Sequence, residues 1–124
     1  MGDERRAMMR FDPMAVDWPA SRRPGIYVKV LWTDEKSGDA AVLVRMDPGC
    51  EYPRHRHVGD EEVLVLQGGF RDERGEYRSG EFHRFAAGSV HAPVALEGEL
   101  PCVLFAVARG GIELLDRKKS SPAG

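Results

Sequence analysis

The chain has 124 residues, which is enough for one domain with a single hydrophobic core. Its 18 Lys and Arg residues nearly balance 20 Asp and Glu residues, so it lacks the basic excess of a nucleic-acid-binding protein. No stretch approaches the roughly 20 apolar residues of a membrane-spanning helix, and residues 1–10 lack the apolar centre of a signal peptide. We therefore expect a cytoplasmic protein that interacts with neither nucleic acid nor membrane.

Two cysteines, Cys50 and Cys102, agree with that compartment, because its reducing conditions keep thiols free. Several prolines within residues 1–25 oppose a long helix, so we interpret this segment as an extended N-terminal arm. Residues 26–116 carry the pattern of one folded domain, and residues 117–124 are expected to form a disordered tail.

About nine short strands are predicted, with no helix, because apolar residues alternate and turn signals recur roughly every eight to twelve residues. The expected strands are 26–32, 40–46, 52–58, 62–67, a hairpin over 70–78, 81–85, 91–96, 102–108 and 112–115. This spacing predicts an all-β sandwich or barrel.

The histidine pair His55 and His57 is the first candidate for chemistry. Residues two apart on a strand point to the same face, so both imidazoles can reach one ion. Glu61 follows a Val-Gly-Asp turn and can return on the next strand with a carboxylate oxygen, and His91 begins a later strand. Such ligands suit Zn, Fe, Mn, Ni or Cu, although a histidine pair on its own is more often ordinary surface or core.

Two spaced motifs favour the metal interpretation. The pattern Gly-x5-His-x-His-x3-Glu-x6-Gly matches without a gap at Gly49, His55, His57, Glu61 and Gly68. The pattern Gly-x5-Pro-x-Gly-x2-His-x3-Asn matches at Gly80, Gly88 and His91, with Ala86 and Ala95 in place of the proline and asparagine. These are the motifs of the cupin superfamily, which the chain resembles. The resemblance implies a double-stranded β-helix, the cupin jelly-roll barrel, with a metal ion at His55, His57, Glu61 and His91.

A narrower resemblance, to ChrR-like cupins, runs from about Trp18 to Gly111. The segments that carry it include Gly59–Leu66, Gly69–Glu73 and Gly88–Ser89. That family includes the zinc-binding domain of anti-sigma factors and stand-alone iron dioxygenases. Residues 1–25 are too few for the sigma-binding helices of those anti-sigma factors, so a direct anti-sigma role is not expected.

Three functions stay open. The first is a small-molecule- or oxidant-responsive module with a His3Glu site and a small-molecule ligand. The second is an iron dioxygenase that cleaves a small carbonyl or aromatic substrate, and the third is a protein-binding cupin whose metal is structural. A bound Glu61 would give a nearly closed site and favour zinc, whereas a released Glu61 would leave open positions on iron. We leave enzyme status open, name no catalytic residue and expect a homodimer, because the arm and the doubly apolar strands need cover.

Some other side chains carry weaker expectations. His83 either lines the barrel mouth as an acid or base or is a solvated strand histidine, and the second interpretation is favoured. Arg56 and Arg84 either meet an anionic ligand or pair with glutamates such as Glu76 and Glu81. Four large aromatic residues are interpreted as core: Trp32, Phe82, Phe85 and Phe105.

Overall fold

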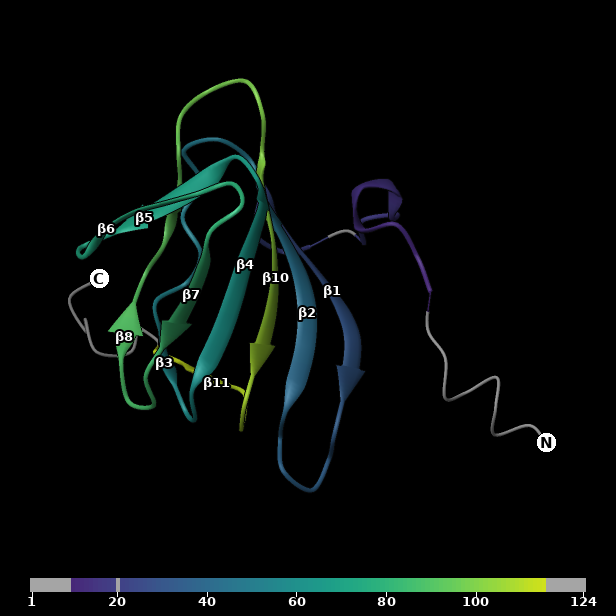
Figure 1. Cartoon of the computed structure of the whole chain (residues 1–124), viewed down its shortest axis with the longest axis vertical. Coiled ribbons are helices and arrows are strands. Elements are labelled where there is room, and N and C mark those ends of the chain that lie inside the picture. The colour runs from purple at the N-terminus through teal and green to yellow at the C-terminus, as the bar shows by residue number, and fades with distance from the viewer. Residues whose placement is uncertain (1–9, 20, 116–124) are drawn as a thin grey trace.

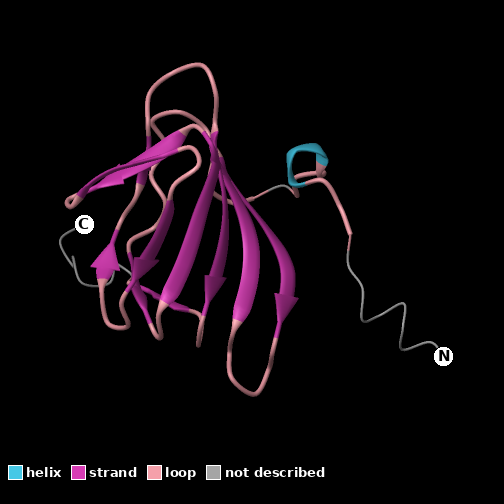
Figure 2. Ribbon diagram, in the orientation of Figure 1, coloured by secondary structure: helices cyan, strands magenta, loops and turns pink. Residues whose placement is uncertain are grey.

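The computed structural model describes residues 10–19 and 21–115. Within these ranges the chain forms eleven β-strands and one short 3-10 helix, Pro13–Ala15, so nearly all of the regular structure in Figure 2 is strand. The expected all-β fold is confirmed. Asp12 caps that helix, because its side chain accepts a hydrogen bond from the Met14 amide, and the helix is too short to cross a membrane.

The strands form three antiparallel sheets. Their bounds are β1 (Ile26–Thr33), β2 (Ala40–Met46), β3 (His55–His57), β4 (Glu61–Gln67), β5 (Gly69–Asp72), β6 (Gly75–Arg78), β7 (Phe82–Phe85), β8 (Val90–His91), β9 (Val94–Ala95), β10 (Cys102–Ala108) and β11 (Ile112–Leu114). The large sheet has the order β1-β2-β10-β4-β7, and the two smaller sheets have the orders β11-β3-β8 and β6-β5-β9. Strands far apart in sequence, such as β2 and β10, therefore lie side by side (Figure 1).

The core lies between the large sheet and the two smaller ones. Alternate residues of the central strands face it, as in Val63 and Val65 of β4 and Leu104 and Ala106 of β10. Phe70 of β5 closes it from the opposite side, with its ring stacked on Tyr77 at 4.6 Å between centroids. Strands β3 and β8, which carry His55, His57 and His91, lie at one end of this sandwich of inward-facing apolar residues (Figure 1).

Two details differ from the sequence expectations. The strand expected over 52–58 is limited to His55–His57, because Pro53 lacks the amide hydrogen that a ladder needs. Trp32 and Phe82 are 51% and 63% exposed and are not core, whereas Phe85 is buried as expected. Phe105 is not core either, because it lies half-buried on the outer face of β10, paired with Leu64. Trp32 follows an irregularity near the end of β1, and Phe82 lies on the outer face of the edge strand β7. The predicted tail, 117–124, and the first nine residues of the predicted arm lie outside the described residues.

Candidate metal centre

Sheet register brings the three histidines together. Strand β3 lies between β11 and β8, and His55 is paired directly with His91 of β8. His57 is two residues further along β3 and shares the inward face, while Arg56 between them points outward to Glu113 at 3.1 Å. All three imidazoles are buried, so the i, i+2 reasoning from the sequence holds.

Each ring is fixed through its Nδ1 atom. His55 Nδ1 donates to the Pro53 carbonyl at 2.8 Å, and His91 Nδ1 donates to Asp72 Oδ2 at 2.8 Å. His57 Nδ1 lies 2.9 Å from Ser89 Oγ, and that hydroxyl donates its own hydrogen to the Ala86 carbonyl at 2.6 Å, so it accepts from the imidazole. Since carbonyl and carboxylate oxygens only accept, the hydrogen of every neutral ring is on Nδ1.

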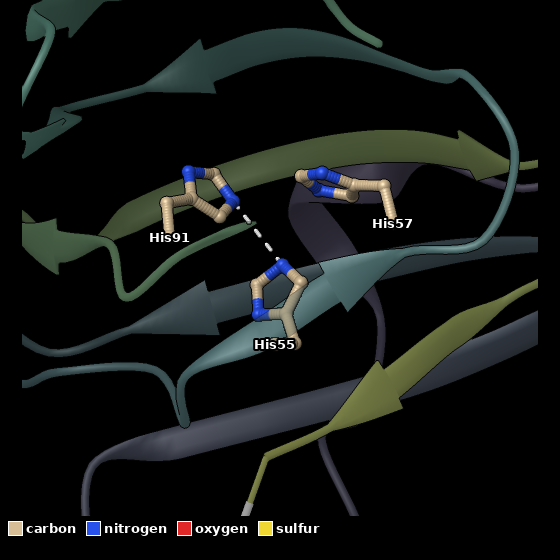
Figure 3. A group of neighbouring side chains, drawn as sticks. All are labelled: His55, His57 and His91. Atoms are coloured by element: carbon tan, nitrogen blue, oxygen red, sulfur yellow. Dashed lines mark hydrogen bonds between the residues drawn. The ribbon is translucent and has the colours of Figure 1, made fainter. Parts of the chain in front are cut away.

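The three Nε2 atoms therefore present bare lone pairs to one another. One ligating nitrogen from each ring lies within 4.8 Å of the others, and the Nε2 atoms of His55 and His91 are 3.1 Å apart (Figure 3). Such a group is satisfied by a metal ion, by an added proton or by a hydrogen-bond donor. Burial opposes the proton, because it lowers the pKa of His55 to about 4 and also lowers the pKa of His91, despite the hydrogen bond to Asp72.

Glu61 stands beside this cluster on β4. Its Oε1 atom is 2.7 Å from His57 Nε2, yet that buried nitrogen has no hydrogen-bond partner among the described residues. The contact is close enough for a salt bridge but has unsuitable geometry for a hydrogen bond, and His57 carries its hydrogen on the other nitrogen. A cation that binds both atoms would remove this conflict.

The donor set fits a divalent transition metal. Imidazole nitrogens from His55, His57 and His91 would hold it, and Glu61 is placed to add a carboxylate oxygen. Such an ion supplies Lewis-acid chemistry, and any coordination position left free can take water or a ligand. The three histidines belong to one small sheet and Glu61 to the large one, so the site bridges the two layers.

Asp72 supports the site from a third sheet and was missed in the sequence analysis. Its side chain is fully buried, and it accepts hydrogen bonds from His91 Nδ1, the Arg74 amide at 2.8 Å and the Tyr77 hydroxyl at 2.9 Å. Burial acts to raise the pKa of Asp72, but these hydrogen bonds outweigh it and hold the pKa below its usual value. Burial and Asp72 together raise the pKa of Tyr77 to about 12. The sequence held one signal. Asp72 is two residues from the apolar Phe70 on the same strand, so alternation predicts a charged side chain on the core-facing side.

A cavity of about 230 Å³ opens beside the histidines. Its polar wall consists of Tyr52, His55, Glu61 and His91, and its apolar wall comes from the inner faces of β1, β2, β4 and β10. His57 does not line the cavity, whereas His55 and His91 do. A ligand in the cavity would therefore approach a bound ion from the side of His55 and His91. Burial and the Glu61 carboxylate raise the pKa of Tyr52, an effect that Arg23 partly offsets.

The other expected polar residues do not reach the cluster. His83 is half-buried, bonds to Glu81 Oε1 at 3.1 Å and packs edge-on against Tyr77, which agrees with the interpretation as an ordinary strand histidine. Both arginines pair with glutamates, as the second interpretation expected, but not with Glu76 or Glu81. Arg56 pairs with Glu113, and Arg84 pairs with Glu62 and Asp60, because strand pairing rather than sequence proximity decides these neighbours. Cys50 and Cys102 are free, as expected.

Comparison with known proteins supports this fold. Residues 6–110 match the model of the family described as ChrR Cupin-like domain. Anti-sigma-E factor ChrR of Cereibacter sphaeroides is 39% identical over 70 residues, which are 56% of this chain and 32% of that protein. The chain thus spans about a third of the length of the curated relative that it matches.

Three solved structures share the fold. The anti-sigma ChrR in complex with SigE of Rhodobacter sphaeroides has a TM-score of 0.66 and 33% identity, over 77% of this chain and 49% of that one. An RmlC-like cupin of Ralstonia eutropha has a TM-score of 0.71 and 27% identity, over 82% and 66%. An acetylacetone dioxygenase of Acinetobacter johnsonii has a TM-score of 0.72 over 88% and 77%, but its 12% identity shows the fold alone. The double-stranded β-helix is confirmed, and this chain belongs to the ChrR cupin-like domain family.

Proposed function

We propose that this chain is a metal-binding, small-molecule- or oxidant-responsive module whose ion is held by His55, His57, His91 and Glu61. One observation carries the proposal: three buried Nε2 lone pairs converge because every Nδ1 is committed to a hydrogen bond. Zinc or iron is the expected ion, and Mn, Ni or Cu would fit the same donors. The relative ChrR binds SigE, so a regulatory role in which the ion's state alters a protein contact agrees with that relationship.

A second candidate is an iron dioxygenase that acts on a small carbonyl or aromatic substrate. Its support is that Glu61 contacts only His57 of the cluster, so three histidines alone could hold iron and leave positions open. The adjoining cavity of about 230 Å³ provides room for a substrate beside those positions.

Metal analysis of protein purified without an affinity tag tests the site. We expect close to one metal ion per chain, with most of it lost in His57→Ala and retained in the control His83→Ala, since His83 lies outside the cluster. Full metal content in His57→Ala would refute the assignment. Oxygen uptake with small diketones and phenolic ketones then separates the candidates: zinc without uptake supports the responsive module, and iron with uptake supports the dioxygenase.

We also propose that the chain forms a homodimer through the outer face of the large sheet. An apolar row crosses three neighbouring strands there through Phe105, Leu64 and Phe82, and exposure rises along it to Phe82. Light scattering should give twice the monomer mass for the unmodified chain and a lower mass for Phe82→Lys. A monomer at high concentration would contradict this proposal.

A further inference from the structure

The cavity beside the histidines is polar at one end only. Its apolar wall includes Val28, Val44, Met46, Phe70, Leu104 and Ala106. No lysine, arginine or side-chain amide lines it among the described residues. A ligand with several polar groups would leave some of them without partners against this wall, and each uncompensated group costs binding free energy. The wall therefore favours a molecule with a single polar end.

Tyr52 stands at that polar end. It follows the turn before β3, and its backbone amide donates to the Pro93 carbonyl at 2.8 Å, which fixes the residue against the link between β8 and β9. Its ring packs edge-on against His55, with 5.3 Å between centroids, and also against the core. Among the described residues, no side chain or carbonyl accepts a hydrogen bond from its hydroxyl. The Tyr52 hydroxyl can therefore donate a hydrogen bond to a ligand in the cavity, next to His55, whose Nε2 faces the cluster.

The size of the cavity limits the ligand. A cavity of about 150 Å³ holds benzene, so about 230 Å³ holds a compact molecule with a few more heavy atoms. We propose that Tyr52 is a specificity-determining hydrogen-bond donor, and that the ligand is a compact, mainly apolar molecule with one oxygen group at the end that faces Tyr52, His55 and His91. This inference rests on the proposed metal site, which would bind the same oxygen.

Phenol and toluene form a matched pair of probes, because they have nearly the same shape and differ in one hydroxyl. Binding of each to metal-loaded protein can be followed by NMR chemical-shift titration, with Tyr52→Phe compared with Tyr27→Phe. Tyr27 is the control, since it lies outside the cavity on the outer face, where Arg45 packs over its ring. The metal content of every preparation is measured alongside.

We expect Tyr52→Phe to weaken phenol binding about fivefold to tenfold and to leave toluene binding within about twofold. Tyr27→Phe should change neither. 1,3,5-Trihydroxybenzene should bind at least about tenfold more weakly than phenol, because its two further hydroxyls would face apolar wall.

Equal loss of phenol and toluene binding in Tyr52→Phe would overturn the inference, since it would reduce Tyr52 to a packing residue. Absence of phenol binding, or equal binding of trihydroxybenzene, would overturn it as well. If Tyr52→Phe binds metal but its phenol binding is unchanged, the role of Tyr52 is refuted and the proposed metal site is not. Protein that takes up no metal but keeps the difference between phenol and toluene would instead refute the proposed function alone.

Discussion

Replacement of Asp72 by asparagine should weaken metal binding although Asp72 contacts no ion. Both carboxylate oxygens of Asp72 accept hydrogen bonds: Oδ2 from His91 Nδ1, and Oδ1 from the Arg74 amide and the Tyr77 hydroxyl. An amide replaces one of these acceptors with a donor. If the NH2 faces His91, the ring must move its hydrogen to Nε2, which then cannot ligate. If it faces Arg74, a backbone amide loses its partner.

Loss of such a supporting group typically lowers metal affinity about 10- to 100-fold, equivalent to about 1.4–2.8 kcal/mol. The assay is competition with a chromophoric chelator, from which the zinc Kd of each variant is obtained. Asp60→Asn is the control, because it makes the same charge change at a half-exposed residue that bonds to the Ala87 amide and lies near Arg84. A zinc Kd for Asp72→Asn within twofold of the unmodified protein would refute the argument that Asp72 fixes the His91 tautomer.

Further outcomes follow from the same geometry. Folding lowers the pKa of His55 from about 6.5 to about 4, so as the pH falls the unfolded chain takes up a proton at His55 before the folded chain does. Metal-free protein should therefore lose on the order of 3 kcal/mol of stability between about pH 6.5 and 4, which denaturant titration at several pH values would measure. Glu61→Gln should weaken zinc binding less than His57→Ala does, and an unchanged affinity would place Glu61 outside the coordination sphere. Gly68→Ala should lower the free energy of unfolding by about 2 kcal/mol or more, since the φ of Gly68 is +68° and a Cβ would lie 2.8 Å from the Pro101 carbonyl oxygen. Gly80→Ala is the control and should lower the free energy of unfolding by less, because Gly80 also has a positive φ, +90°, but its Cβ would meet no atom within 4 Å.

The convergence of the three histidines was predictable because strand alternation and motif spacing place them. A period of two fixes the common face of His55 and His57, and motif spacing gave His91 and Glu61. The position of Glu61 relative to the cluster was not predictable, because it depends on how the large sheet packs against β3.

Asp72 and the exposed aromatic residues illustrate what alternation leaves undetermined. Parity gives the face of a strand, but it does not give the sheet that covers this face. Asp72 acquires its role only because β5 packs near β8, and Phe82 is exposed because β7 is an edge strand with an uncovered outer face. The individual partners of the arginines could not be predicted for the same reason, since the β4–β7 register places Arg84 opposite Glu62.

At the proposed site, metal binding would be coupled to folding, because the candidate ligands and Asp72 come from all three sheets. His55, His57 and His91 come from one small sheet, Glu61 from the large sheet, and Asp72 from the other small sheet. A bound ion would replace the repulsion between the facing lone pairs with attraction to all of them, so its binding free energy would also stabilise the barrel. The cavity shares His55, Glu61 and His91 with the site, and a ligand that alters their coordination would therefore alter the packing of the sheets.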